Sequence, residues 1–344
     1  METATGVNLF SPMRLRGVTA RNRLWISPMC QYSVFAEDGI PTDWHLVHYG
    51  SRAVGGAGLI LVEATAVEAR GRISAQDLGL WDNAQVDAYR PMVRFMAEHG
   101  AVPGVQLAHA GRKAMVPGSI GPSALAFSQQ YQTPAEMSEA DIQQVVEAFR
   151  QTAVRAAEAG FQAVEIHSAH GYLIHQFLSP LANRRNDRYG GSFENRIRLH
   201  LEVVRAVRSV WPDDLPLLVR ISATDWAEGG WDIDQSVELA RRLPAEGVDL
   251  IDVSSGGLTP DQKIQLGPGY QTPFAERIRR EADIATGAVG LINEARQADA
   301  IVREGRADAV LVARQSLRDA YWPLHAAREL GVEPNVPTQY RRAW

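Results

Sequence analysis

The pattern of hydrophobic positions along the chain alternates short apolar runs with longer stretches of helical periodicity. Most of the apolar runs lack a strict polar–apolar alternation, which is typical of parallel strands covered on both faces. The pattern therefore predicts about eight buried parallel strands. They are expected at residues 23–29, 58–67, 102–109, 161–167, 215–222, 247–255, 285–290 and 307–314.

The segments between these runs carry the start and stop signals of helices. Asp82 precedes a periodic stretch that stops at Gly100. Ser138 opens the sequence "SEAD", a capping-box pattern, and the stretch that follows ends at Gly160. A strand followed by a helix, repeated about eight times with short connections, predicts a (β/α)8 TIM barrel. The alternative with the same element order is a doubly wound sheet.

The ends of the chain predict two additions to a single barrel domain. No linker or low-complexity tract divides residues 1–344, so we expect one domain. Residues 8–22 are expected to form a β-hairpin that caps the N-terminal end of the barrel. The C-terminal tail, residues 331–344, ends in "YRRAW", and its terminal tryptophan suggests docking on a partner subunit rather than a solvated basic tail.

Composition narrows the class of protein. A formal net charge of −5 argues against nucleic acid as the main partner. No apolar run approaches the roughly 20 residues needed to cross a bilayer, and the first residues lack the apolar core of a signal peptide. We therefore expect a cytoplasmic protein with no membrane partner. The single cysteine, Cys30, excludes disulfides within the chain and multi-cysteine zinc or iron–sulfur sites.

A barrel would gather its functional side chains at the C-terminal ends of the strands. Polar residues at or just beyond those ends come from several strands, so one shared pocket is geometrically reasonable. They are Cys30, Glu63, Gln106, His109, His167, His170, Arg220, Ser254 and Arg314.

The segment "EIHSAHGYLIHQFLSP", residues 165–180, concentrates candidate chemistry. His167 and His170 lie three residues apart and Tyr172 follows. With His109 as a third ligand the histidines could bind zinc. As neutral imidazoles they could donate hydrogen bonds to a carbonyl oxygen or an anion, and the tyrosine could donate a proton. Structural hydrogen bonding is the third possibility, and it is the role expected for His175.

The loops after the last two strands predict a phosphate site. Barrels commonly bind phosphate there through backbone N–H groups, and Gly290, Ala313 and Arg314 occupy these positions. The alternative is a tight turn that requires glycine. Arg220 could bind an anion or pair with a neighbouring carboxylate, and Cys30 could be a buried structural thiol or a weak donor beside a cofactor.

Taken together, the motifs resemble the old yellow enzyme family of flavin-dependent ene-reductases over nearly the whole chain. The resemblance is carried by "SPMCQYS", "VEATAV", "QLAHAGRKA", "EIHSAHGYLIHQFLSPLANRRNDRYGGSFENRIR", "VRIS", "AVGLI", "GRADAVLVAR" and "QYRRAW". The long fourth-strand segment and the cysteine after strand one resemble the subclass of thermophilic and xenobiotic-reducing bacterial members. The family implies a (β/α)8 barrel with non-covalent FMN, reduced by NADPH or possibly NADH.

The resemblance also implies which residues bind FMN. Gly290, Ala313 and Arg314 would hold the phosphate, although Ala313 stands where many members have glycine. Cys30 stands where many relatives have threonine and would tune the flavin's reduction potential. The residues implied around the isoalloxazine ring are Pro28, Met29, Cys30, Ala64, Gln106 and Arg220.

The implied chemistry is hydride transfer from the reduced flavin N5 to the β-carbon of an activated alkene. The substrate would be an enone, enal, maleimide or nitroalkene, with its oxygen bound by His167 and His170. Tyr172 or solvent would protonate the α-carbon, and Tyr32 would line the pocket. Arg342 would enter the active site of a partner subunit, which implies a homodimer or homotetramer.

The resemblance further suggests that Arg112 and Lys113 help to hold FMN or the nicotinamide cofactor.

Three other functions compete with the interpretation as an ene-reductase. A metal-dependent barrel hydrolase would use His109, His167 and His170, whereas the resemblance implies no metal. A non-catalytic phosphate-binding barrel would not explain the His/His/Tyr set. A dienoyl-CoA reductase-like protein would need an iron–sulfur cluster, which one cysteine cannot supply.

Overall fold

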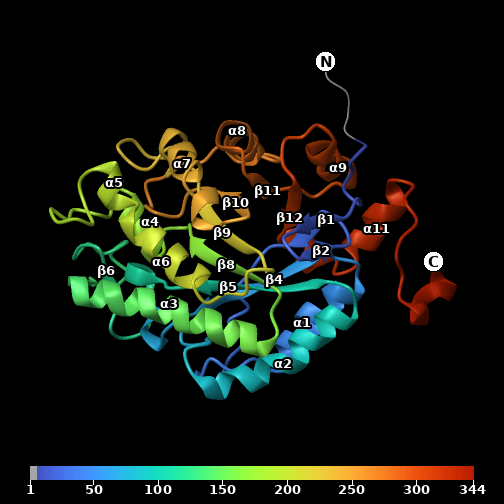
Figure 1. Cartoon of the computed structure of the whole chain (residues 1–344), viewed down its shortest axis with the longest axis horizontal. Helices are drawn as coiled ribbons and strands as arrows, with labels where there is room; N and C mark the ends of the chain where they lie inside the picture. Colours follow the sequence, from blue (N-terminus) through green and yellow to red (C-terminus); the bar gives the residue numbers. More distant parts are fainter. Residues whose placement is uncertain (1–5) are drawn as a thin grey trace.

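The computed structural model describes residues 6–344, and its centre is a closed barrel of eight parallel strands. Around the barrel the order is β10-β11-β12-β3-β4-β5-β8-β9, so strands that follow one another pair as neighbours (Figure 1). The predicted (β/α)8 barrel is confirmed, and the doubly wound alternative is wrong. The strands are β3 (Leu24–Ile26), β4 (Leu59–Ala66), β5 (Val102–Ala108), β8 (Ala163–Ser168), β9 (Leu217–Ser222), β10 (Leu250–Ser254), β11 (Ala285–Ala288) and β12 (Ala309–Val312).

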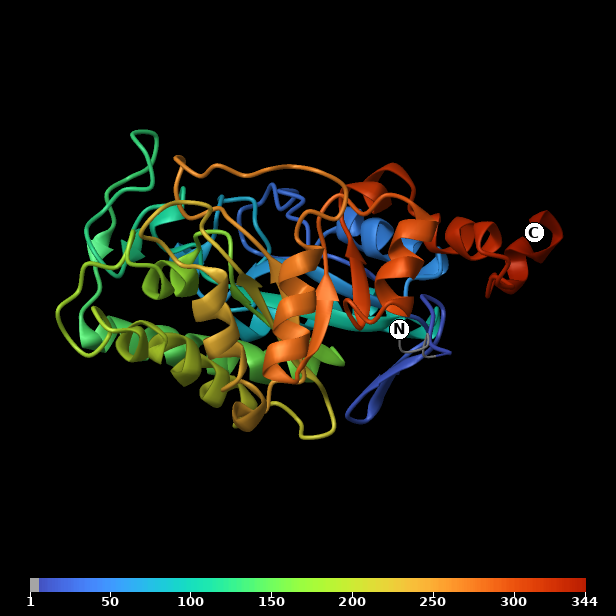
Figure 2. The same ribbon diagram turned by 90° about the horizontal axis from the view of Figure 1, so that it is seen from above.

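Helices surround the barrel, as Figures 1 and 2 show. None of those in residues 6–344 is long and apolar enough to span a membrane. The helices are α1 (Asp43–Val54), α2 (Asn83–Glu98), α3 (Glu139–Ala159), α4 (Leu173–Leu178), α5 (Phe193–Arg196), α6 (Arg198–Arg208), α7 (Ile233–Ala240), α8 (Thr272–Ala282), α9 (Ala295–Arg303), α10 (Arg314–Arg318) and α11 (Trp322–Glu329). Short 3-10 helices are η1 (Ala69–Gly71), η2 (Gly111–Lys113), η3 (Pro244–Glu246) and η4 (Thr338–Ala343).

Two small strand pairs lie outside the barrel. The first is the antiparallel hairpin of β1 (Met13–Leu15) and β2 (Val18–Ala20), which confirms the expected N-terminal hairpin. Met13 and Ala20 pack with the apolar residues inside the barrel, so the hairpin covers its N-terminal end. The second pair is β6 (Ile120–Gly121) with β7 (Ala135–Glu136). Residues 1–5 of the expected domain lie outside the described residues.

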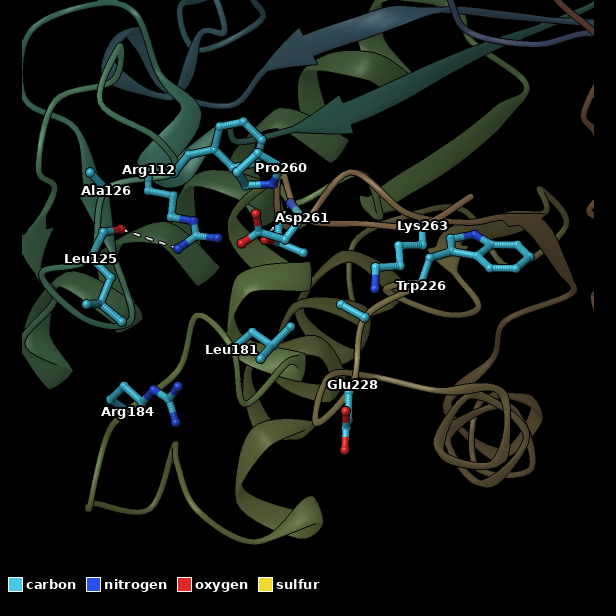
Figure 3. A pocket seen from close by; sticks show the side chains of 13 residues that line it. Arg112, Leu125, Ala126, Leu181, Arg184, Trp226, Glu228, Pro260, Asp261 and Lys263 are labelled. Carbon is cyan, nitrogen blue, oxygen red and sulfur yellow. Dashed lines mark hydrogen bonds between the residues drawn. The ribbon is translucent and has the colours of Figure 1, made fainter. Parts of the chain in front are cut away.

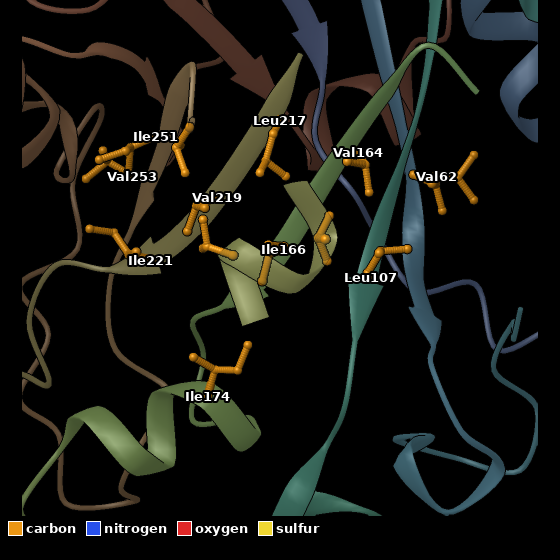
Figure 4. Packing of buried hydrophobic residues seen from close by; sticks show 14 of the residues in the cluster. Val62, Leu107, Val164, Ile166, Ile174, Leu217, Val219, Ile221, Ile251 and Val253 are labelled. Atoms are coloured by element: carbon orange, nitrogen blue, oxygen red, sulfur yellow. The ribbon is translucent and has the colours of Figure 1, made fainter. Parts of the chain in front are cut away.

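The side chains of each strand divide between two cores. Outward-facing residues such as Val164, Ile166 and Val219 pack against the helices (Figure 4). Inward-facing residues at the N-terminal end, including Leu61 and Leu218, fill the barrel with apolar groups. Toward the C-terminal end the inward positions become polar. The inward-facing and polar positions there are Gln106, Glu165, His167, Arg220, Asp252 and Ser254, all of them buried.

The helix signals in the sequence match the observed ends. Ser138 is the N-cap of α3, where its Oγ accepts the Asp141 backbone N–H at 3.2 Å and Asp141 bonds back to the Ser138 N–H at 2.9 Å. Gly160 ends the same helix in the left-handed conformation with φ 93°. Asp82 caps α2 in the same manner as Ser138. These local signals fix where helices begin without reference to the rest of the fold.

We expect Ser138→Ala to lower the free energy of unfolding by about 1 kcal/mol, because the substitution removes the acceptor for an N-terminal helix N–H. In a chain of this size that corresponds to a fall of roughly 1–2 °C in the melting midpoint. Calorimetry would measure it, with Gln129→Ala in an exposed loop as the control. Equal midpoints for the two variants would contradict the capping role.

Candidate active site

The floor of the candidate site is a buried ion pair at the C-terminal end of the barrel. Arg220 on β9 and Asp252 on β10 are register partners, and the Arg220 Nε lies 3.1 Å from the Asp252 Oδ2. Beside them, Gln106 donates from Nε2 to the Glu165 Oε1 at 2.7 Å. Burial and the neighbouring Asp252 raise the pKa of Glu165 to about 8, so this carboxyl is largely neutral at pH 7. Burial also raises the pKa of Asp252, against the opposing charge of Arg220, so the floor places one guanidinium beside two buried carboxyl groups.

Above this floor His167, His170 and Tyr172 lie together. The His167 ring is 5.1 Å from the His170 ring and 5.0 Å from the Tyr172 ring, both edge to face. His167 is also the register partner of Arg220. The spacing of the two histidines in the sequence thus brings both rings to the barrel mouth, because one ends β8 and the other begins the loop after it.

His170 is held in a left-handed backbone conformation with φ 58°. Its N–H donates to the Ser222 Oγ at 2.9 Å, its carbonyl accepts the Lys113 Nζ at 2.9 Å, and its Nε2 lies 2.7 Å from the Ser254 Oγ. Gly257, at φ 90°, packs so closely that an added Cβ would lie 2.6 Å from the His170 Cα. A left-handed backbone at a residue other than glycine, as at His170, costs about 1–3 kcal/mol. It persists only where surrounding contacts fix the residue.

Both imidazoles are neutral at physiological pH. Burial, and then the positive charge of Arg220, hold the pKa of His167 and that of His170 well below the ordinary value of 6.5. The Nδ1 of His167 accepts the Ala169 backbone N–H at 3.3 Å, so its proton is on Nε2. This N–H lies 3.4 Å from the Nδ1 of His170. The two ring nitrogens therefore lie next to each other at the barrel mouth.

Tyr172 remains a phenol over the same pH range. Burial raises its pKa well above 10, and the nearby Cys30 and Tyr32 add to that effect. The ammonium of Lys113 lies 4.9 Å from the centre of the Tyr172 ring. Burial, together with the positive charge of the adjacent Arg112, lowers the pKa of Lys113 to about 8. The site thus combines two neutral imidazoles with one neutral phenol.

The loop after β3 forms a second wall of the site. Cys30 is partly exposed, and burial followed by the charges of Asp77 and Glu63 raises the pKa of its thiol, so no reactive thiolate is favoured. Glu63 sits at a β-bulge of β4, where it accepts the Gln31 backbone N–H at 3.0 Å and the Tyr49 hydroxyl at 2.6 Å. Because the bulge takes Glu63 out of the regular strand pairing, its side chain can bond to Gln31 and anchor the loop after β3.

A cavity of 170 Å3 lies at the ends of β11 and β12. Gly290, Ala313 and Arg314 line it together with Tyr270 and Gln271. Gly290 has φ 121°, and an added Cβ would lie 2.8 Å from the Gln271 Nε2, so only glycine fits. An exposed guanidinium beside such a backbone cradle fits the phosphate of a cofactor.

Comparison with known proteins places this arrangement in a family. Residues 8–333 match a protein-family model, which is described as the NADH:flavin oxidoreductase / NADH oxidase family. The chain is 56% identical over 337 residues to an NADPH dehydrogenase of Geobacillus sp. (strain WCH70), covering 98% of both chains. It is 51% identical to an NADPH dehydrogenase of Listeria monocytogenes (strain ATCC BAA-679 / EGD-e), covering 98% of this chain and 99% of the relative. The chain belongs to the NADH:flavin oxidoreductase / NADH oxidase family.

Solved structures agree with that assignment. Morphinone reductase superposes with a TM-score of 0.82 at 28% identity, covering 98% of this chain and 93% of that one. The old yellow enzyme homologue from Zymomonas mobilis gives a TM-score of 0.80 at 27% identity, covering 95% of this chain and 94% of that one. The resemblance to the old yellow enzymes is therefore confirmed, and this flavin oxidoreductase uses the expected FMN and nicotinamide cofactors.

The expected site residues of the flavin oxidoreductase fall into two groups. Most lie at one end of the barrel, with His167, His170 and Tyr172 in mutual contact. Arg342 lies in η4, exposed and outside its own barrel, as Figure 2 shows for the C-terminal tail. His109 does not join the histidine pair, because its Nε2 bonds to Glu68 at 2.8 Å. Within residues 6–344 no cluster of three or more His, Cys, Asp or Glu side chains could hold a metal.

Sequence reasoning missed several partners that hold the flavin oxidoreductase's site residues. Asp252 pairs with Arg220. It lies two residues before Ser254 on the same strand, and that spacing could have indicated that its side chain faces the inside of the barrel as Ser254 does. Asp225 bonds through Oδ1 to the His175 Nε2 at 2.8 Å, and His175 in turn accepts the Gly171 N–H. This pair anchors the loop that carries His170. The structural role expected for His175 agrees with these contacts.

The lowered pKa values of the buried histidines make the stability of this flavin oxidoreductase depend on pH. Below about pH 6.5 the unfolded chain binds more protons than the folded one, so the free energy of unfolding falls as pH falls. Each such histidine contributes up to about 1.36 kcal/mol per pH unit. We expect His167→Asn with His170→Asn to flatten the fall in the guanidinium midpoint between about pH 7.5 and 5.5. An unchanged slope would contradict the neutral-histidine assignment.

Proposed function

We propose that this flavin oxidoreductase is an NAD(P)H-dependent ene-reductase that reduces the C=C bond of activated alkenes. Enones, enals, maleimides and nitroalkenes are the substrate class, because each carries an oxygen conjugated with the double bond. The observation that supports this most strongly is the pair of neutral imidazoles whose Nε2 and Nδ1 atoms lie 3.4 Å apart at the barrel mouth. That arrangement suits one acceptor oxygen, and Tyr172 stands beside it.

The residues present fit FMN. Gly290, Ala313 and Arg314 would hold the phosphate in the 170 Å3 cavity. Arg220 at the barrel mouth would place a positive charge beside the isoalloxazine and favour its anionic reduced form. The ring would also contact Pro28, Met29, Cys30, Ala64 and Gln106. FMN supplies hydride chemistry once a nicotinamide cofactor has reduced it.

The two histidines would bind and polarise the substrate oxygen. His167 already carries its proton on Nε2. For His170 to donate to the same oxygen, its proton must be on Nδ1. The Ser254 hydroxyl at 2.7 Å from Nε2 would then donate to that nitrogen and stabilise this tautomer. Withdrawal of electron density through the bound oxygen makes the β-carbon of the substrate electrophilic.

Tyr172 would supply the proton to the α-carbon. Its raised pKa keeps the hydroxyl protonated, and its ring is held between His167 and the Lys113 ammonium. Tyr32 would line the same pocket. Its φ of 51° and the hydrogen-bond anchor of Glu63 on the neighbouring Gln31 set its position.

The C-terminal tail would complete the active site of a second subunit in a homodimer or homotetramer. Trp344 stacks on His325 with ring centres 5.3 Å apart, and Tyr340 packs on Tyr321, so the tail is ordered against α11 of its own chain. Arg341 and Arg342 remain exposed at its end. In this arrangement Arg342 would bind substrate in the partner's pocket.

The visible spectrum under anaerobic conditions tests the function. We expect a flavin spectrum that bleaches with NADPH and returns with cyclohexenone. His167→Ala with His170→Ala should keep the flavin but weaken phenol binding at least about 100-fold, because two donors to one oxygen are lost. His99→Ala, remote from the site, is the control. A protein that stays colourless with added FMN, or a double variant with undiminished phenol affinity, would sink the proposal.

Arg342→Ala should raise the KM for cyclohexenone about tenfold while leaving flavin reduction by NADPH unchanged, because a charge-assisted contact to the substrate is lost. Arg341→Ala is the matched control on the same tail. Sedimentation velocity would establish whether both variants keep the assembly of the parent. Equal kinetics for the two variants would argue against a role for Arg342.

A further inference from the structure

A second and larger cavity, of 730 Å3, opens beside the histidine site. Loops after four barrel strands form its walls, and Figure 3 shows Arg112 on one side with Trp226 and Lys263 on the other. Phe127 and Arg184 also line the cavity. Neither His167 nor His170 lines this cavity, so it is distinct from the space above the histidines.

The cavity shares its wall with the histidine site. Arg112 lines the cavity, and the adjacent Lys113 donates to the carbonyls of His170 and Gly257 at 2.9 and 3.1 Å. The Arg112 Nη2 donates to the Leu258 carbonyl at 2.7 Å, and Thr259, the next residue, lines the cavity. The histidine site and the cavity are therefore separated by the thickness of these two loops.

Arg112 is the feature of the cavity that indicates a ligand. Its side chain is buried, with 5% of its surface exposed, yet its hydrogen bonds go to backbone carbonyls, those of Leu258 and, at 3.4 Å, Leu125. In the part of the chain that the structure describes, its Nε has no partner and no carboxylate lies within 4.0 Å of it. Burial lowers the pKa of this guanidinium to about 10. A buried cation whose side-chain hydrogen bonds go to carbonyls, and whose nearest opposing charge is the more distant Asp225, favours binding of an anion.

The rest of the lining suits an aromatic phosphate ester. Arg184 and Lys263 are exposed cations on facing walls, and the exposed carboxylates of Glu228 and Asp261 line the same cavity, so cations outnumber anions by three to two when Arg112 is included. Phe127 lies 5.8 Å from the Arg112 guanidinium and offers a ring face. Trp226 also lines the cavity, and its buried Nε1 has no hydrogen-bond partner within residues 6–344. Cations, ring faces and free donors together match a phosphorylated nucleoside.

We propose that this cavity binds the phosphorylated adenosine end of NADPH, with Arg112, Arg184 and Lys263 contacting its phosphates. The proposal rests on the proposed function, because a nicotinamide placed near the histidines must extend its adenosine part elsewhere. Coenzyme A carries a related group, with the phosphate on the 3′ rather than the 2′ position of the ribose. The two sources are distinguished by the position of that phosphate.

Titration calorimetry with 2′,5′-ADP tests the site without requiring turnover, and 3′,5′-ADP serves as the comparison ligand. Arg112→Gln should weaken 2′,5′-ADP binding about tenfold, as expected for one lost charge-assisted contact. Since Arg112 also bridges two loops, a second variant, Arg184→Gln with Lys263→Gln, changes exposed residues alone. Arg94→Gln, exposed on α2, is the charge-matched control and should bind as the parent does.

Tighter binding of 2′,5′-ADP than of 3′,5′-ADP, reduced in both pocket variants and kept in the control, would establish the site. Equal or tighter binding of 3′,5′-ADP would overturn the assignment to NADPH, as would undiminished binding in both pocket variants. The ratio of NADPH to NADH affinity in anaerobic flavin reduction should fall about tenfold in the double variant. Failure of the parent to reduce flavin with either nicotinamide would instead overturn the proposed function, independently of the calorimetry.

Discussion

The Arg220–Asp252 ion pair is the constraint on which the rest of the site depends. A charge inside a barrel is costly unless it is paired, and here the pair sits where the apolar interior gives way to the polar mouth. The guanidinium then acts on its surroundings. Burial lowers the pKa of both His167 and His170, and the charge of Arg220 lowers it further, so both imidazoles stay neutral. A single buried cation thereby helps to keep the two imidazoles beside it uncharged.

The geometry of the histidine pair depends in turn on a contact between two loops. Gly257, after β10, packs against the backbone of His170, after β8, so closely that no side chain fits between them. Lys113 bridges the same two loops through their carbonyls. The position of His170 is therefore fixed by three strand ends at once. Loops on a rigid barrel can hold a left-handed residue in this way, because each strand end is itself fixed by the closed sheet.

Much of the fold could be predicted because its signals are local. All eight strands were recognisable as short apolar runs, and Ser138, Asp82 and Gly160 mark helix ends through bonds to near neighbours. The partners of the site residues could not be predicted in this way. Asp252 and Arg220 are 32 positions apart in the chain by their numbering, and only barrel closure makes them neighbours. The bulge that redirects Glu63 leaves no mark in the apolar pattern of β4.

The distribution of positive charge explains how an acidic chain can handle anionic cofactors. The net charge is −5, yet Arg220, Arg314 and Arg112 stand at three separate places around the barrel mouth. Arg314 lies at the ends of β11 and β12 and Arg112 beyond β5, with the histidines between them. Local fields at such short range outweigh the overall charge, which salt screens over about 8–10 Å. The barrel mouth therefore carries separate cationic side chains around a neutral pair of histidines, and this pattern is the basis of both the proposed flavin site and the proposed nucleotide cavity.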